Sequence, residues 1–483
     1  MAITPASQTR AGAVKAALSE NYLDIQNNGW AQQYLPDLME KEAEVFGKRT
    51  ISGFLSQVGA EEAMAADQVI WSEQGRLHLS YKGTVGTHTT STIQLDTDID
   101  DQDVGTTHGV RVGDTVLVAS AALTVQCYVS QINSDTNGDQ NAGSTDFITV
   151  APYSHEHLDN AGFGTNDAVT VLVYGSEYAK GVAGKVGSNE PSFTTFTNKP
   201  IIMKDMYQVS GSDVSQIGWV EVSGEDGQNG YYWYLKAEGD TRSRFADYCE
   251  MSLIESEKAA TTSIALGGAN DANELQGTEG LFAAVESRGH QTSGVTGVNA
   301  ATDLAEFDAI LAEFDKNGAI EENMMFLNRA TALAMDDMLA SMNSYGAGGT
   351  SYGVFDNSED MALNLGFSGF RRGSYDFYKS DWKYLNDLAT RGGINARNTA
   401  GAIRGVIIPA GTSSVYDESL GKNLVRPFLH TRYRASNTES RKMKTWVTGS
   451  VGAVTSDLDA MTVNFLTERC LVVQGANNFM LMN

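Results

Sequence analysis

The feature that most restricts the fold is an acid-rich window at residues 86–179. It holds 13 acidic residues and a single basic one, Arg111. Four short runs in the window are rich in β-branched residues, and turn signals such as Asn137-Gly138 separate them: GDTVLVASA, LTVQCYVSQI, DFITVAP and AVTVLVYG. Short runs of this kind between turns are typical of all-β modules. We therefore predict an inserted all-β domain at residues 86–179 with an acidic surface of its own.

Two extended segments flank the acid-rich window. Residues 66–83 and 191–211 contain many β-branched and aromatic residues and alternate in places, as strands do. We expect them to be the outgoing and returning strands of one long β excursion. On this basis, residues 61–85 and 180–227 form an extended loop that carries the β domain.

An arm of residues 1–60 precedes this loop. Its apolar residues recur at mixed spacings of three and four, which predicts short amphipathic helices. Short helices need a partner surface to form. That surface belongs either to the same molecule or to a neighbouring copy, and the sequence leaves both open.

A long helix is predicted within residues 228–262. One face carries a stripe that recurs every three or four residues, with charges on the opposite face: Tyr234, Ala237, Thr241, Phe245, Tyr248 and Ser252. Gly239 weakens the helix locally. We interpret the stripe as a packing face and not as a cofactor site.

Residues 263–425 indicate an α/β domain with helices over a small sheet. Residues 263–300 are rich in Gly, Ala and Ser, and we expect a loop there. A helix then starts near Asp303 and ends at Asn317. Three further patterns follow, namely a strand and helix in NMMFLNRATALAMDDMLASMNSYG, a helix in WKYLNDLATRGG, and a buried strand in GAIRGVIIPAG that ends at Pro409.

The tail at residues 426–483 is again β-rich and stays apolar almost to its end. Chain ends are usually polar and frayed. We therefore expect the apolar end to be tied into a sheet or an interface. Taken together, the segments predict an α+β fold.

Charge and cysteine content restrict the function. A net charge of −26 argues against a protein whose main task is to grip a nucleic-acid backbone. The three cysteines are widely spaced and give neither a disulfide framework nor a zinc motif, which fits a reducing cytoplasm: Cys127, Cys249 and Cys470. There is no secretory signal and no apolar run of about 18 residues, so no membrane partner is expected.

Three motifs that suggest chemistry are weak. Ser351 lies in a G-x-S-x-G pattern, but the strand and helix that a nucleophile elbow requires are missing around it. In SHEHLD, His155 and His157 would point to opposite faces of a strand, so a polar loop is favoured over a metal site. DTNGDQNAGSTD resembles a calcium loop, but Gln140 replaces the required Gly and Asp146 is shorter than the bidentate Glu. We expect no catalytic residue, no metal and no cofactor.

The run DTDIDDQD, at Asp96–Asp103, places five aspartates in eight residues. No matching set of ligands lies nearby in the sequence. We interpret the run as a solvated acidic linker at the entrance to the β domain. Ion binding at a contact between subunits is the alternative.

One basic cluster interrupts the acidic trend. Its members fall within one β-rich segment: Arg426, Arg432, Arg434, Arg441, Lys442 and Lys444. Two interpretations are equally open, a solvated strand face and a contact with acidic groups of a neighbouring copy. Contact with nucleic acid is weaker, because stacking aromatics are not interleaved with the cations.

The order of arm, extended loop, long helix, α/β domain and β return resembles the major capsid proteins of tailed bacteriophages, which have the Hong Kong 97-like fold. The stretches AMAADQVIWSEQGRLH and FLTERCLVVQGANNFML are similar to capsid proteins of short-tailed phages, including the crAss-like group. The resemblance covers nearly the whole chain, although its motifs are diffuse. It implies that residues 228–262 form the spine helix of a peripheral domain and residues 263–425 an axial domain. Residues 426–483 would complete both, and the β insertion departs from the minimal fold.

The resemblance also implies a function. It predicts a structural protein that forms the hexamers and pentamers of an icosahedral head, assembled in the host cytoplasm and located in the virion. The head would enclose double-stranded DNA without sequence specificity, and its other partners would be portal and decoration proteins. The alternatives are another virion component, such as a decoration or tail protein, and a hydrolase that uses Ser351 or the acidic window, with Asp98→Asn as a test of the latter.

Overall fold

The chain divides into two compact units in a computed structural model. One unit is Ser72–Thr195, and the other combines Met1–Trp71 with Phe196–Asn483. The structure describes residues 51, 53–75, 78–99, 101, 103–104, 108–133, 147–185, 193–216, 222–223, 229–230, 232–260, 263, 275–318, 320–344, 369–397, 401–410, 412–417, 422–450 and 454–483. Most of the predicted N-terminal arm lies outside these residues.

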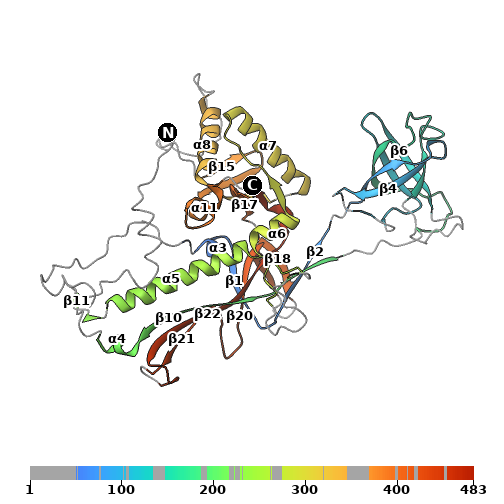
Figure 1. The fold of residues 1–483 in the computed structure, drawn as a ribbon. Coiled ribbons are helices and arrows are strands. Elements are labelled where there is room, and N and C mark those ends of the chain that lie inside the picture. Colours follow the sequence, from blue (N-terminus) through green and yellow to red (C-terminus); the bar gives the residue numbers. More distant parts are fainter. Residues whose placement is uncertain are drawn as a thin grey trace. The chain divides into compact units, whose positions relative to one another are not determined.

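The unit Ser72–Thr195 contains a closed β-barrel (Figure 1). Neighbouring strands are antiparallel in the order β3-β4-β7-β6-β5-β8. Their bounds are β3 Ser80–Val85, β4 Thr92–Asp98, β5 Asp114–Ala119, β6 Thr124–Asn133, β7 Phe147–Pro152 and β8 Ala168–Ser176, and the 3-10 helix η1 is His88–Thr90. Alternate side chains, such as Val116 and Val118, are fully buried inside. Closure pairs both edges of every barrel strand.

The four strands predicted in the acid-rich window are confirmed as β5 to β8. The sequence pattern misses β4 and assigns β3 to the wrong element, although both belong to the barrel. β3 lies in residues 61–85, which the sequence assigns to the extended loop. β4 contains Asp96 and Asp98 of the run interpreted as a linker. Both strands bury only every second residue and carry polar residues between, so their apolar signal is short.

The second unit contains a five-stranded sheet in which β22 is central. The sheet runs β1-β20-β22-β10, and β21 also pairs with β22. The bounds are β1 Ala60–Met64, β10 Ile201–Ser210, β20 Leu429–Arg434, β21 Lys444–Gly449 and β22 Ala460–Val473. β1 is parallel to β20, and the other pairs are antiparallel. The sheet therefore joins segments from both ends of the chain.

Helix α5, Tyr232–Glu255, lies along this sheet (Figure 1) and confirms the predicted long helix. Its Phe245 ring packs against Phe465 of β22, with ring centroids 6.0 Å apart. Buried residues recur at intervals of four along the helix: Ala237, Thr241, Phe245, Cys249 and Leu253. Because a helix has 3.6 residues per turn, each interval of four rotates the buried face by about 40°. Tyr248, predicted to belong to the buried stripe, is 52% exposed.

A six-stranded sheet forms the second layer of this unit, in the order β13-β23-β17-β14-β16-β15. Its strands are β13 His290–Thr292, β14 Glu322–Leu327, β15 Gly369–Arg372, β16 Tyr375–Asp381, β17 Gly405–Pro409 and β23 Met480–Met482. Apolar side chains fill both faces, since Phe326 and Met325 of β14 belong to two different cores. Two-sided burial explains the continuous apolar runs in β17 and β23. β23 also confirms that the apolar tail is tied into a sheet.

Helices α7, Ala300–Asn317, and α8, Arg329–Ser344, cover one face of the six-stranded sheet. Both helices are confirmed. The start of α7 is corrected: its N-cap is Asn299, whose side chain accepts a hydrogen bond of 2.9 Å from the Thr302 backbone N–H. Asp303 is instead buried and accepts from the Gly297 N–H. Gly318 ends the helix with φ of 62°, which favours glycine.

The loop predicted at residues 263–300 is wrong in part. It contains α6, Leu281–Arg288, and β13. α6 is too short for a periodic signal and owes its helical state to burial against both sheets. The remaining helices are α3 Phe54–Val58, α4 Gly211–Gln216, α10 Lys383–Asn386, α11 Arg391–Asn395 and the 3-10 helix η4 Ala476–Asn478.

Three two-stranded ribbons complete the described elements. They pair β2 Val69–Gln74 with β9 Phe193–Asn198, β11 Val222–Ser223 with β12 Asn229–Gly230, and β18 Thr412–Asp417 with β19 Lys422–Pro427. The β2–β9 ribbon is the chain's passage between the two units. It joins the outgoing and returning segments that the sequence places in one β excursion.

Candidate functional site

The predicted basic cluster lies on the five-stranded sheet. Arg432 and Arg434 belong to β20, Lys444 begins β21, and Arg441 and Lys442 lie between these strands. Arg426 belongs instead to β19, and its side chain lies outside the described part of the chain. Five of the six predicted residues therefore lie in one region of the fold.

Carboxylates of the same chain contact these cations on one face of the sheet. The Arg432 guanidinium lies 2.8 Å from a Glu62 carboxylate oxygen of β1, and the two residues are register partners. Glu468 of β22 lies 2.7 Å from the Arg441 guanidinium and 3.9 Å from that of Arg434. Arg434 also pairs with Asp67. The edge strand β1 is thus tied to its neighbours by charge as well as by its backbone.

A second set of contacts lies on the other face. Glu61 of β1 pairs with Lys442 and lies 3.6 Å from the Arg469 guanidinium. Arg469 donates a hydrogen bond of 2.6 Å to the Lys442 carbonyl, and the Lys442 ammonium lies 5.4 Å from the centre of the Tyr433 ring. Alternation along β1 sends Glu61 and Glu62 to opposite faces, so β1 is held from both sides.

We call these residues the β1 ion-pair cluster. It contains six cations and five carboxylates: Arg432, Arg434, Arg441, Lys442, Lys444, Arg469, Glu61, Glu62, Asp67, Glu439 and Glu468. The formal excess is one positive charge. The hydrogen bond from Lys444 lowers the pKa of Glu439, and the hydrogen bond to Asp67 raises the pKa of Arg434. Most of these positive charges are therefore paired with carboxylates of the same chain.

Sequence reasoning finds five of the six cations of this cluster, but it misses Arg469 and the carboxylate partners. Glu61, Glu62 and Asp67 stand more than three hundred positions before the arginines. Nothing in the local pattern connects the two segments. The parallel pairing of β1 with β20 brings them together.

The other predicted motifs do not converge on a site. Ser351 and the calcium-like loop, residues 135–146, lie outside the described residues. His155 and His157 lie in a loop, and no group of three metal-ligating side chains occurs in the described part of the chain. In the acidic run, Asp101 lies 2.6 Å from the Lys82 ammonium of β3.

Two further predictions concern the whole chain. All three cysteines are buried and free, in agreement with the absence of a disulfide framework. Among the described helices, none is long and apolar enough to cross a membrane.

Comparison with known proteins finds likenesses only among solved structures. No family model matches the chain, and no curated protein matches it. The chain is similar to a structure from Microbacterium phage Oxtober96, with 9% identity over 94% of this chain and 97% of that chain, and a TM-score of 0.35. It is similar to the capsid structure of the cyanophage P-SCSP1u, with 7% identity, coverage of 100% and 98%, and a TM-score of 0.40.

A third similar structure is the asymmetric unit of the bacteriophage PhiM1 mature capsid, with 8% identity, coverage of 92% and 91%, and a TM-score of 0.37. All three TM-scores are low. The mixed composition of helices and strands in the described residues agrees with the predicted α+β class.

Proposed function

We propose that this chain is a virion structural protein, and specifically the major capsid protein of a tailed bacteriophage with a Hong Kong 97-like fold. One observation carries the proposal. A long helix, α5, lies along a five-stranded sheet, a separate six-stranded sheet follows, and the last strands, β22 and β23, return to complete the two sheets in turn. This order corresponds to the spine helix, axial domain and β return that the sequence resemblance implies.

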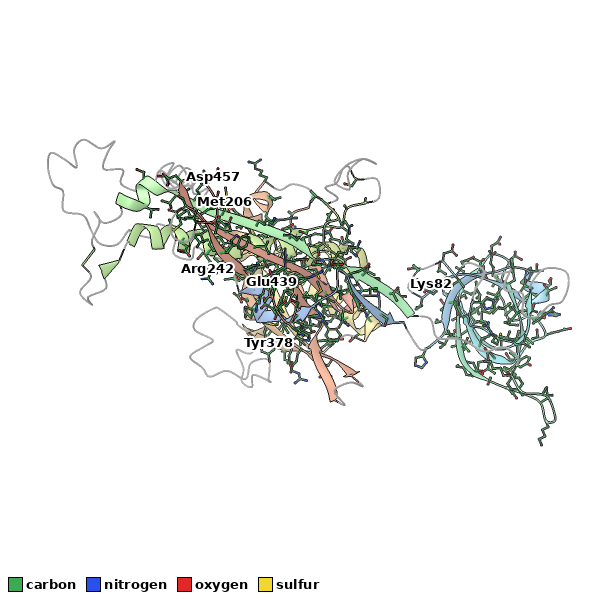
Figure 2. The ribbon with its side chains drawn as sticks, turned by 90° about the horizontal axis from the view of Figure 1, so that it is seen from below. Lys82, Met206, Arg242, Tyr378, Glu439 and Asp457 are labelled. Atoms are coloured by element: carbon green, nitrogen blue, oxygen red, sulfur yellow. The ribbon has the colours of Figure 1, made fainter. Side chains whose placement is uncertain are left out.

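The uncovered surface supports a protein that assembles. On β10, Ile202 and Met206 project away from α5 and are 54% and 59% exposed; Figure 2 shows Met206 on this strand. Val447 of β21 is also exposed, but on the opposite face, because its register partner Val463 packs with Phe245 of α5. Apolar side chains gathered on an open sheet mark interaction surfaces. Two-stranded ribbons such as β2–β9 also bury little of their own surface. Contacts between copies would bury the surface that the ribbon leaves open.

The partners follow from this proposal. Copies of the chain form hexamers and pentamers of an icosahedral head, with portal and decoration proteins as other head components. Double-stranded DNA is enclosed without sequence specificity, and the net charge of −26 keeps the shell from adsorbing it. Within the β1 ion-pair cluster, we propose contact with carboxylates of a neighbouring copy for Lys442 and Lys444, whose side chains are the most exposed of the cations.

Assembly of the purified chain tests the proposal. We expect negative-stain electron microscopy to show capsomers or closed shells after the chain is concentrated. A chain that stays a compact monomer under every condition contradicts the proposal. Copy number separates a decoration or tail protein from a major capsid protein, because the latter dominates the protein gel of purified particles.

A further inference from the structure

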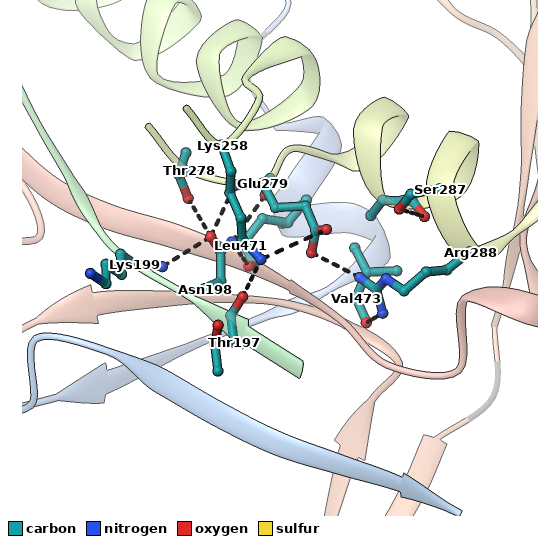
Figure 3. A network of polar contacts seen from close by, with 11 residues as sticks. Thr197, Asn198, Lys199, Lys258, Thr278, Glu279, Ser287, Arg288, Leu471 and Val473 are labelled. Atoms are coloured by element: carbon teal, nitrogen blue, oxygen red, sulfur yellow. Dashed lines mark hydrogen bonds and ion pairs between the residues drawn. The ribbon is translucent and has the colours of Figure 1, made fainter. Parts of the chain in front are cut away.

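The root of the β2–β9 ribbon is held by a buried polar network in the larger unit (Figure 3). At the end of β9, the Asn198 side-chain amide donates hydrogen bonds to the Leu471 carbonyl at 2.6 Å and the Glu279 carbonyl at 3.0 Å. Its oxygen accepts from the Glu279 N–H at 2.9 Å and the Thr278 hydroxyl at 3.1 Å. One buried side chain thus joins β9 to β22 and to the segment before α6.

Arg288, the last residue of α6, contacts the same root. Its guanidinium carbon lies 4.4 Å from the centre of the Phe196 ring and 5.7 Å from that of Trp71. The same guanidinium lies 2.8 Å from a Glu279 carboxylate oxygen. Phe196 and Trp71 belong to β9 and β2, so one cation touches both strands of the ribbon. The planar guanidinium allows stacking and ion pairing at once, which an ammonium cannot match.

These contacts fix the ribbon and are separate from the apolar cores of the larger unit. Trp71 and Phe196 lie outside the buried apolar clusters that join α5, α6 and the two sheets in the described residues. A two-stranded ribbon has no core of its own. The direction in which its strands leave the unit therefore depends on the contacts at its root.

We propose that Arg288 and Asn198 are positioning residues for assembly, which hold the ribbon root in one orientation so that the chain beyond it is presented correctly to neighbouring copies. This inference rests on the proposed capsid function. Arg288 acts through Phe196 and Trp71, and Asn198 acts through the backbone of Glu279 and Leu471.

The test compares Arg288→Lys with wild type in the full-length chain. Lysine keeps the charge opposite Glu279 but loses the stacked plane. Because a desolvated cation–π contact contributes up to about 2 kcal/mol, we expect hydrogen–deuterium exchange in residues 69–74 and 193–198 to become about tenfold faster. The unfolding temperature should stay within about 2 °C of wild type, and the yield of complete shells should fall at least about tenfold. Arg242→Lys, at an exposed arginine of α5, is the matched control and should change nothing.

The outcomes separate the two levels of inference. Wild type that forms no capsomers or shells overturns the proposed capsid function and, with it, the positioning role. If wild type assembles and Arg288→Lys assembles equally well, only the positioning role is overturned. Unchanged exchange in the ribbon also overturns it. Glu279→Gln, which keeps the shape but removes the ion pair, replaces Arg288→Lys if that variant does not fold, and the same outcomes apply to it.

Discussion

At the scale of single residues, Phe54 joins the parts of the larger unit. Its ring stacks on Trp382, with centroids 4.2 Å apart, and meets Phe326 of the six-stranded sheet edge-on at 4.7 Å. The preceding backbone is held from α5, where Asp247 accepts from the Ile51 N–H and Glu250 accepts from the Phe54 N–H. A chain segment outside both sheets thus fills a place between them.

Truncation of this ring should be costly. We expect Phe54→Ala to lower the free energy of unfolding by about 3–5 kcal/mol, because a buried aromatic ring is lost and a cavity remains. Urea unfolding followed by tryptophan fluorescence measures the effect in the larger unit. Tyr248→Ala, at an exposed aromatic of α5, is the control and should change the free energy by no more than about 0.5 kcal/mol. Equal effects in the two variants would show that Phe54 has no special packing role.

The thiol of Cys127 gives a prediction about pH. Burial inside the barrel raises the pKa of Cys127 to about 12, whereas an unfolded thiol has a pKa of about 8.5. Its contribution to stability is therefore complete below about pH 8.5 and is lost as pH rises towards 12, by about 1.4 kcal/mol per pH unit. We expect native Cys127 to resist iodoacetamide at about pH 9.5 and to react within minutes in urea. Peptide mass spectrometry measures both rates, and similar rates would contradict the prediction.

At the scale of elements, the β1 ion-pair cluster combines one nearly buried carboxylate with others that are half-buried or exposed. The Glu468 side chain is 11% exposed and lies between two arginines, whereas that of Glu439 is 48% exposed and pairs with Lys444. Loss of a buried partner leaves an uncompensated charge and lowers the free energy of unfolding, whereas an exposed ion pair contributes little to that free energy.

These two carboxylates therefore form a matched pair of variants. We expect Glu468→Gln to destabilise the larger unit by about 1–3 kcal/mol, because its arginine partners are partly exposed and solvent screens the charge left behind. Glu439→Gln should leave the stability of the unit unchanged. Chemical denaturation of each variant measures the difference. The prediction fails if the exposed position proves as costly as the buried one.

The elements also show where a local sequence pattern is enough to predict secondary structure. The periodicity of α7 and the alternation of β5 to β8 are long enough to be recognised locally. α6 is too short for that, and β3 and β4 bury only alternate residues, so tertiary contacts decide their state. Five of the six cations of the β1 ion-pair cluster are visible as a run, but Arg469 lies outside that run, and the partners on β1 depend on the pairing of distant strands. Long-range pairing of this kind has no local signal.

At the scale of the whole molecule, the barrel unit has what an independent domain requires. Its six strands close on themselves, and its interior is filled by its own side chains. A closed barrel exposes no strand edge. We expect residues 72–195, expressed alone, to fold cooperatively.

Circular dichroism and thermal unfolding of that fragment provide the measurement. A β-type spectrum with one sigmoidal transition is expected. The matched comparison is Val116→Asp in the same fragment, which buries a charge in the barrel interior and should abolish the transition. A wild-type fragment that lacks a transition would mean that the barrel depends on the rest of the chain.

The central position of β22 has a consequence for how the protein is made. β22 and β23 leave the ribosome after every other described strand, yet one is the middle of the five-stranded sheet and the other lies between β13 and β17. Both sheets of the larger unit therefore stay incomplete until these strands have been synthesised. The barrel, whose strands all lie before Thr195, can fold while synthesis continues. In the proposed capsid assembly, a unit that cannot close before these two strands arrive also delays the moment at which neighbouring copies can recognise it.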